Sequence, residues 1–491
     1  MNQRLEELVT QNFVKAPTEP CLWWRGAWWS RGTIEEMAEE CEANLAEGGF
    51  SPGRRLALVL PNSPLMLASS IAVWKLGGTV VPVSPQLKHP PLVEYLRSVD
   101  VFGAIVSPEI EGLAEHVRAS GIPAVSAALG DAAPLIAGRE SLPDGDTDNA
   151  VLFHTAGAGG DVKAVPITHW NIITLLSSIL ETIPSTDEDD VILNAIPNYH
   201  SLGFVIGGIM PLASGMPQVV VSSFVPPKNT LAAIRAAGVT IIPAVPTLLS
   251  ILLGGERDIT PMQKVKLVFY GGGELTPGIA ARAKEIFGVE PLEGYGLTEA
   301  SSVLAVTPDA GSAKPGSSGK ILPCFDAEVR GDDGQVLPFG SDGRLWLRGD
   351  AVAGGYYRTP DLTAERFKDG WFDAQDIVRI DEDGFITIVS PAVDVIMVGG
   401  APVYSAEVEA VLRGHPDISE VAVVGVPGGI KGETVKAYVV QKEGSALRPY
   451  DIVKYGRSKL PNYKAPRSVK LLDALPKDSF GKVLKKELRG A

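Results

Sequence analysis

The sequence predicts an α/β protein. A large N-terminal body holds mostly parallel sheets covered by helices plus a β-rich subdomain, and a small mobile α+β domain follows. A chain of 491 residues is too long for one ordinary core. Buried-strand patterns alternate with helical patterns as far as residue 290, which is typical of parallel sheets covered on both faces. A region rich in glycine and proline, with strand-like patterning, runs from 311 to 389, and a shorter α+β pattern then begins.

The body begins with a predicted hairpin and helix. Leu22-Trp23-Trp24 and Ala27-Trp28-Trp29 flank a turn at Arg25-Gly26, which predicts two paired strands. Thr33 with Glu36 three residues later has the spacing of a capping box, so Thr33 is expected to cap a helix.

Buried strands and helices fill the rest of the body. Residues 55–60 and 77–83 predict strands of the parallel sheet. The apolar stretch 203–224 is interrupted by glycine and proline, which predicts buried strand and helix rather than a membrane span.

The last hundred residues predict a separate unit. A short strand at 396–398 precedes a helix at 405–413, and further strands are expected near 418–425 and 434–441. We place the boundary near Ser390-Pro391, which divides the chain into residues 1–389, the body, and 390–491, the C-terminal domain.

Composition excludes several classes of protein. The formal net charge of −14 argues against a nucleic-acid binder. From residue 450 onward, however, eleven Lys and Arg face four acids, so the end of the chain is basic. Such a segment fits either an anionic partner or a solvated helical face. Three widely spaced cysteines indicate neither a disulfide framework nor a zinc site, and the N-terminus lacks an apolar signal core, so the cytoplasm is expected.

Four segments have the chemistry of a nucleotide site. Residues 151–163 run from an apolar strand through a loop of small residues to Lys163, an arrangement that presents backbone N–H groups and a charge to phosphate. Three glycines at 271–273 let a planar ligand lie against backbone. In 292–300, an aromatic ring between glycines precedes a hydroxyl and a carboxylate. Asp376 is expected to end a turn before a strand, where it can accept hydrogen bonds from two ribose hydroxyls.

A fifth segment lies near the C-terminus. Leu475-Pro476-Lys477 leads to Gly481-Lys482, and the glycine leaves room beside the lysine in a narrow site. An ammonium group brought to a phosphate stabilises the negative charge that develops in nucleotidyl transfer.

In this order and spacing, the segments resemble the adenylate-forming superfamily, which includes acyl-CoA synthetases, acyl-acyl-carrier-protein synthetases and luciferases. The resemblance covers nearly the whole chain. Within 291–325, LEGYGLTEAS and AKPGSSGKILP look closest to the carrier-protein synthetase part of the bacterial enzyme that reacylates lysophospholipid. The resemblance to this superfamily implies that ATP, with Mg²⁺, and a carboxylic acid form an acyl-adenylate. A thiol of CoA or acyl carrier protein would then take the acyl group.

The resemblance also implies a role for each matched residue. Tyr295 would stack on adenine, Asp376 would hold the ribose, Glu299 would hold Mg²⁺, and Lys482 would bridge the carboxylate and the α-phosphate. Asn198-Tyr199-His200-Ser201 matches the segment that lies beside the acyl pocket in this family. His200 is also consistent with an ordinary buried histidine. The remaining implied residues are Thr298, Thr155, Gly157, Gly160 and Lys163 at phosphate, Gly272, Gly273, Glu274 and Gly296 near adenine, and Gly203 near the acyl group.

The chain departs from the family pattern in three motifs. The phosphate loop T-S-G-[ST]-[ST]-G-x-P-K-G has lost its inner hydroxyls to Ala156, Ala158 and Gly159. Each lost hydrogen bond to a charged group costs about 1.5–3 kcal/mol. The ribose motif T-G-D reads Ala374-Gln375-Asp376, and the hinge motif G-R-x-[KD]-D-x-I-K has Pro391 and Val393 in place of its Arg and its polar pivot residue.

Two functions fit these departures. The protein either still activates a carboxylic acid, with backbone groups and lysines replacing the lost hydroxyls, or binds an acyl-nucleotide or acyl-thioester, or acts as a scaffold, without adenylation. Val225 stands where amino-acid-activating members place an Asp, which disfavours amino acids, and apolar neighbours such as 204–206 fit a fatty or aromatic acid or plain core. The basic residues within 454–489 are a candidate surface for an acidic carrier protein.

Overall fold

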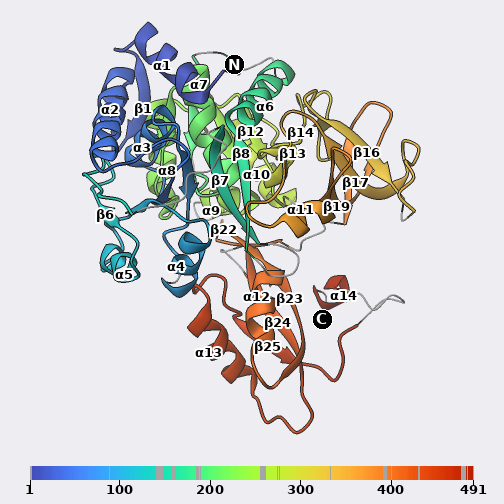
Figure 1. Ribbon diagram of the computed structural model, residues 1–491. Coiled ribbons are helices and arrows are strands. Elements are labelled where there is room, and N and C mark those ends of the chain that lie inside the picture. The colour runs from blue at the N-terminus through green and yellow to red at the C-terminus, as the bar shows by residue number, and fades with distance from the viewer. Residues whose placement is uncertain are drawn as a thin grey trace.

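The computed structural model describes residues 3–87, 89–139, 148–156, 162–183, 187, 189–254, 261–273, 275, 277–331, 333–390, 395–399, 401–428, 432–476, 483 and 485–489. Several predicted residues, namely Gly157, Gly160, Glu274, Lys482 and the hinge positions 391–394, lie outside these ranges. The predicted boundary at 390 therefore stays a prediction. The α/β class itself is confirmed (Figure 1).

A six-stranded sheet forms one layer of the body. Its order is β6-β5-β3-β4-β7-β8, and every pair is parallel except β7–β8. The strands are β3 (Arg55–Val59), β4 (Thr79–Pro82), β5 (Gly103–Val106), β6 (Ala124–Ser126), β7 (Asn149–Ala156) and β8 (Val162–Thr168). Helices α4 (His89–Ser98) and α5 (Leu113–Ala119) cover one face, where Ala57 and Val59 pack against Leu92 and Val117.

A nine-stranded sheet forms a second layer, in the order β15-β14-β13-β12-β11-β9-β10-β1-β2. Its strands are β1 (Pro20–Trp24), β2 (Ala27–Ser30), β9 (Ile192–Asn194), β10 (Gln218–Val220), β11 (Ile241–Ala244), β12 (Leu267–Tyr270), β13 (Leu292–Tyr295), β14 (Ala305–Val306) and β15 (Lys320–Ile321). Helices α8 (Pro227–Ala237), α9 (Pro246–Leu253) and α10 (Pro277–Phe287) pack on its outer face. The predicted hairpin is confirmed by the β1–β2 pair.

The space between the two sheets is filled by helices. Residues 64–74 of α3 (Pro64–Lys75) are all buried, which requires packing on every side. The core also takes in α1 (Leu5–Lys15), α2 (Arg31–Glu47), α6 (His169–Thr182), a π-helix (Leu202–Ile209) and α7 (Met210–Ser214). Phe204 packs edge-on against Trp74 and Phe153, so this apolar residue belongs to the core.

The cap of α2 differs from the prediction. The Ser30 hydroxyl accepts a hydrogen bond from the backbone N–H of Thr33 at 3.1 Å, so Ser30 is the cap and Thr33 is the third helical residue. The prediction of Thr33 as the cap was wrong because Ser30, at the end of β2, already has the extended backbone that a cap needs.

The β-rich subdomain is antiparallel. It contains β16 (Asp326–Arg330), β17 (Asp342–Arg348), α11 (Pro360–Arg366), β18 (Phe367–Lys368), β19 (Trp371–Ile380) and β20 (Ile386–Ser390). Asp376 lies inside β19, so the prediction that it ends a turn before a strand was wrong. The register of β19 shifts between Asp373 and Ile377, and Gln375 has φ +63°. A bulge, which continues the strand while re-aiming a side chain, takes the place of the expected turn.

The C-terminal domain lies beneath the body in Figure 1. Its elements are β21 (Val395–Val398), β22 (Ala401–Tyr404), α12 (Ser405–Arg413), β23 (Ile418–Pro427), β24 (Glu433–Gln441), α13 (Pro449–Lys459), β25 (Ser468–Leu471) and α14 (Lys485–Arg489). Alternation along β23 gives the sheet β23-β24-β25 two buried faces. None of the helices described here is long and apolar enough to cross a bilayer.

Candidate active site

The glycine-rich segment after β12 lies beside the end of β13. The two strands are parallel neighbours, with Tyr270 opposite Glu293. Gly272 has φ +79°, a conformation that residues with a side chain rarely adopt. A Cβ on Gly296 would lie 1.8 Å from the Ser302 carbonyl oxygen, so only glycine fits directly after Tyr295. The glycines therefore allow the backbone to fold closely around this ring.

Tyr295 and Asp376 meet although they come from different sheets. The Tyr295 hydroxyl donates a hydrogen bond to Oδ2 of Asp376. Burial, followed by the adjacent carboxylate, holds the pKa of Tyr295 well above its ordinary value, so the phenol stays protonated. The structure thus brings together the residues expected at adenine and ribose.

Thr298 and Glu299 lie on a 3₁₀ turn (Thr298–Ala300) that follows β13. The Thr298 hydroxyl lies 3.4 Å from the Ser201 hydroxyl, next to His200 in the chain. The Tyr356 hydroxyl donates to Oε1 of Glu299 at 2.8 Å. Glu299 is consequently held in place through Oε1, and none of the described residues donates a hydrogen bond to its second oxygen.

Lys163 joins the same cluster from β8. It is paired across the β7–β8 ladder with Thr155, and its ammonium lies 4.8 Å from the centre of the Tyr356 ring. The Lys163 side chain is 8 % exposed. Burial, followed by the Arg366 guanidinium, lowers the pKa of Lys163, whereas Glu299 opposes this shift. Lys163, Tyr356 and Glu299 therefore form a continuous polar group from three segments.

His200 lies two residues before the π-helix. Its Nε2 atom is buried and has no hydrogen-bond partner among the described residues. Two main causes lower the pKa of His200 to about 3: the loss of hydration, which is the larger, and the nearby Lys464 ammonium. Gly203 packs tightly, since a Cβ there would lie 2.2 Å from the Pro197 carbonyl oxygen. His200 is therefore a neutral imidazole at neutral pH.

The donors at Glu299 fit a magnesium ion that is held mainly by substrate phosphates. Mg²⁺ usually keeps several waters and takes one or two protein carboxylates in such sites. Within the described ranges, no group of three or more His, Cys, Asp or Glu side chains is placed to hold a metal. A single carboxylate, Glu299, agrees with a metal that is held mainly by substrate phosphates. The described residues contain no metal site built from protein side chains alone.

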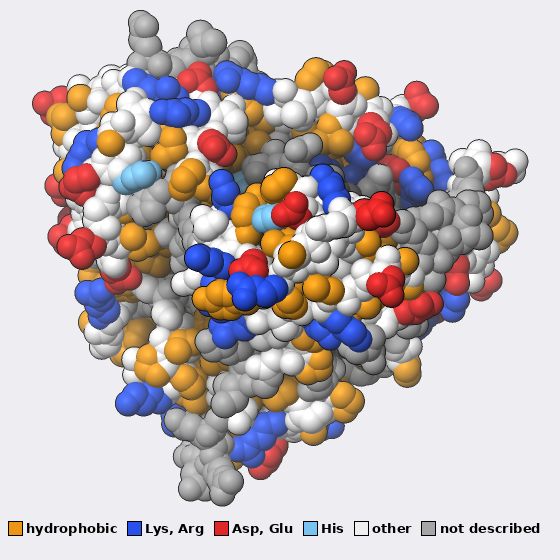
Figure 2. Space-filling model, turned by 90° about the horizontal axis from the view of Figure 1, so that it is seen from below, with side chains coloured by type: hydrophobic (Ala, Val, Ile, Leu, Met, Phe, Trp, Pro, Cys, Tyr) orange, Lys and Arg blue, Asp and Glu red, His pale blue; other side chains and the backbone are white. Residues whose placement is uncertain are grey.

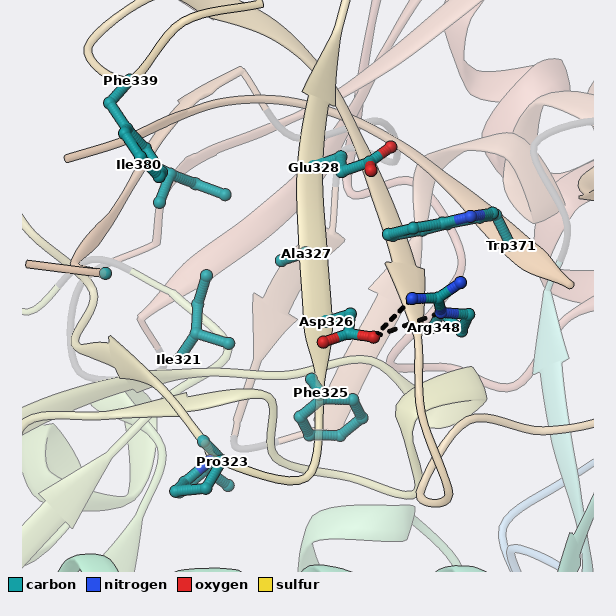
Figure 3. Close-up of a pocket in the computed structure, with 12 residues that line it drawn as sticks. Ile321, Pro323, Phe325, Asp326, Ala327, Glu328, Phe339, Arg348, Trp371 and Ile380 are labelled. Atoms are coloured by element: carbon teal, nitrogen blue, oxygen red, sulfur yellow. Dashed lines mark hydrogen bonds and ion pairs between the residues drawn. The ribbon is translucent and has the colours of Figure 1, made fainter. Parts of the chain in front are cut away.

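Two hollows lie near these elements. The larger, about 450 Å³, is an open groove of the β-rich subdomain in which Arg348 pairs with Asp326 and lies beneath Trp371 (Figure 3). None of the described site residues lines it. The smaller, about 30 Å³, lies between the body and the C-terminal domain and is lined by His200, His154 and Lys464 among others. Only the smaller hollow adjoins the predicted site.

Sequence reasoning missed three side chains of this region: Tyr356, Arg366 and Lys464. Tyr356 follows Gly354-Gly355, the same combination of glycine and aromatic residue that marked Tyr295, and was detectable on that ground. Arg366 and Lys464 occupy ordinary helical and turn patterns, and only the tertiary fold brings them to the site.

The chain is similar to known proteins over most of its length. The model of the AMP-binding enzyme family matches residues 9–357, and that of the AMP-binding enzyme C-terminal domain matches 407–482. A feruloyl-CoA synthase from Amycolatopsis sp is 32% identical over 459 residues, which cover 91% of each chain. A long-chain-fatty-acid–CoA ligase from Escherichia coli O6:H1 is 28% identical over 99% of this chain and 94% of its own.

Solved structures share the fold. An amide bond synthetase from Marinactinospora thermotolerans matches with a TM-score of 0.84 and 26% identity over 99% of both chains. An o-succinylbenzoate CoA synthetase from Bacillus subtilis, a double mutant bound with its product analogue, matches with a TM-score of 0.85 and 24% identity over 100% of this chain and 99% of its own.

This fold carries a glycine-lined aromatic ring that is hydrogen-bonded to an aspartate, together with a lysine–carboxylate cluster. The family matches show that it is an adenylate-forming protein. The chain belongs to the AMP-binding enzyme family, as the resemblance found in its sequence motifs indicated.

Proposed function

We propose that this protein is an AMP-forming acid–thiol ligase. It activates a fatty or aromatic carboxylic acid with ATP and Mg²⁺ to an acyl-adenylate and transfers the acyl group to the thiol of CoA or of a carrier protein. The observation that supports this most directly is the contact of Lys163 and Glu299 with Tyr356, because a cation near a tethered carboxylate has the chemistry to bind phosphates and their metal. We place the enzyme in the cytoplasm.

The proposed chemistry assigns a task to each residue. Tyr295 stacks on adenine and Asp376 accepts from the ribose, once the ribose displaces the Tyr295 hydroxyl. Thr298 and Lys163 donate to phosphate, Glu299 holds Mg²⁺, and Lys482 from the C-terminal domain reaches the α-phosphate. Mg²⁺, when bound, neutralises charge on the phosphates.

A second candidate function rests on the altered phosphate loop. A protein of this family without the inner hydroxyls of that loop could bind an acyl-nucleotide or acyl-thioester without making one. One experiment separates the two functions. Purified protein is given ATP, Mg²⁺ and a panel of carboxylic acids, with and without CoA and carrier protein, and pyrophosphate release is measured. No acid-dependent release, together with no Mg·ATP binding by calorimetry, would reject the ligase.

The exposed basic side of α13 carries a separate prediction about the thiol substrate. Lys454, Arg457 and Lys459 are exposed on this helix, and the face seen from below in Figure 2 shows Lys and Arg side chains interspersed with Asp and Glu. If this helix binds an acidic carrier protein, charge reversal of the three residues raises the KM for carrier about 10-fold and leaves pyrophosphate release unchanged.

The matched control reverses three exposed lysines of the body, Lys228, Lys264 and Lys284. The change in net charge is the same, but these residues lie in or near α8 and α10. Equal losses of carrier use in both triple variants, or loss of adenylation in the α13 variant, would contradict a carrier surface on α13.

A further inference from the structure

The hollow between the body and the C-terminal domain contains a buried ion pair that none of the proposed steps uses. Lys464 is 5 % exposed, and its ammonium donates to both oxygens of Glu407, at 2.8 and 2.6 Å. Glu407 belongs to the first turn of α12, and Lys464 to the turn after α13. The pair thus joins α12 to the segment after α13 on the side of the C-terminal domain that lines the hollow.

Body residues surround this pair. The hollow is lined by Lys464 and Tyr463 from the C-terminal domain and by Pro82, Val83, Ser84, Leu87, His154, Tyr199 and His200 from the body. Ser84 and Tyr199 of the body line this hollow together with Tyr463 of the C-terminal domain, so the two parts of the chain meet here. The Lys464 end of the C-terminal domain is therefore docked against the end of the site that holds His200.

Leu475 and Val483, which are described residues before and after Lys482 in the chain, lie on the other face of the C-terminal sheet. Val421 and Val423 point to the face that is covered by α12 and α13 and contains Ala465. Ala422 and Val424 point to the opposite face, where Leu475, Val483 and Leu488 pack and where the Tyr438 hydroxyl donates to the Leu488 carbonyl at 2.6 Å. A domain position that docks Lys464 beside His200 thus turns the face with Leu475, Val483 and Leu488 away from His200.

We propose that Lys464, held by Glu407, is a positioning residue that fastens the C-terminal domain for transfer of the acyl group to the thiol, and not for adenylation. This inference rests on the proposed function, in which Lys482 serves adenylation. In the transfer, the thiol sulfur bonds to the acyl carbon while the thiol proton is released. The bond from that carbon to the phosphate oxygen breaks, and AMP leaves with the electron pair.

The charges in the hollow predict how this docking depends on pH. The pKa values of His154 and His200 are both lowered to about 3. Loss of hydration is the larger cause, and the Lys464 ammonium is the second. Tyr95, Tyr199 and Ser84 of the body and Glu407 and Tyr463 of the C-terminal domain are the other polar groups here. Because the Lys464 ammonium comes from the C-terminal domain and lowers both pKa values, protonation of either histidine opposes docking, and docking weakens as the pH falls.

The experiment measures the two half-reactions separately in single turnovers. Acid-dependent pyrophosphate release without thiol reports adenylation, and transfer from supplied acyl-adenylate to CoA reports the second step. We expect Lys464→Met and Glu407→Gln to slow transfer about 10-fold or more and to leave adenylation within about 2-fold, with Lys464→Arg partly restoring transfer. Wild-type transfer should also fall as the pH is lowered, and fall less in Lys464→Met.

Arg448→Ala is the control. It removes another ion pair of the C-terminal domain, with Asp451, at an exposed site, and is expected to change neither step. Equal loss of both steps in the Lys464 variants, or unchanged transfer, would overturn the inference. A wild-type protein that transfers from supplied acyl-adenylate but activates no acid would overturn only the proposed function, and absence of transfer from supplied adenylate would overturn this inference too.

Discussion

Replacing Lys482 by alanine is expected to lower acid-dependent pyrophosphate release by about 100- to 1,000-fold, while transfer from supplied acyl-adenylate to the thiol stays within about 5-fold of wild type. The reason is electrostatic. An ammonium that reaches the α-phosphate stabilises charge that develops only in the transition state of adenylation, so its removal lowers the rate constant and not just substrate binding. The measurement is a single-turnover comparison of the two half-reactions.

Lys485→Ala provides a matched control for this prediction. Lys485 is three residues further along, and its ammonium bonds the Ser405 hydroxyl at 2.7 Å and Glu409 at 2.8 Å within the C-terminal domain. Removing it deletes a lysine from the same tail without deleting the group that we assign to the phosphate. Adenylation that survives in Lys482→Ala, or that is lost equally in Lys485→Ala, would show that Lys482 does not act on the α-phosphate.

Much of the fold followed from hydrophobic periodicity. The strand patterns at 55–60 and 77–83 became β3 and β4 of the parallel sheet, and the helix expected at 405–413 became α12. Local signals were less reliable where two residues competed for one role, as with Ser30 and Thr33 at the start of α2. The π-helix at 202–209 has no separate sequence signature, because its apolar residues satisfy several helical periods at once.

The site was predictable as a set of motifs and not as a set of contacts. Gln375 illustrates the difference. The sequence showed that the glycine of the ribose motif is missing, but φ +63° at Gln375 shows that the left-handed backbone is kept. Such a conformation costs a residue with a side chain about 1–2 kcal/mol, which the surrounding strand pairing must offset. Asp376, which accepts the hydrogen bond from Tyr295, directly follows Gln375, and no local pattern predicts this contact.

Lys464 is a residue whose environment could not be predicted from the sequence. The sequence placed it among eleven basic residues near the C-terminus, for which a solvated face and an anionic partner were both open. Its burial against Glu407 separates it from the exposed lysines of α13. The basic segment therefore contains residues with different environments, which charge counting alone does not distinguish.

The second large effect is expected at Glu299. Glu299→Gln keeps the shape of the side chain and an oxygen that can accept from Tyr356, but removes the negative charge assigned to Mg²⁺. We expect adenylation to fall about 100-fold or more, with a raised requirement for Mg²⁺, because Mg²⁺ binds carboxylate far better than amide oxygen. The measurement is initial pyrophosphate release across a magnesium titration.

Tyr356→Phe separates the charge of Glu299 from its positioning. This variant removes only the 2.8 Å hydrogen bond to Oε1 and keeps the aromatic ring beneath Lys163. Losing one hydrogen bond to a charged acceptor corresponds to about 1.5–3 kcal/mol at most, or roughly 10- to 150-fold. The loss should be smaller than that of Glu299→Gln, and the magnesium dependence should stay close to wild type. If Glu299→Gln instead shows an unchanged magnesium dependence, Glu299 orients Tyr356 and Lys163 and does not hold the metal.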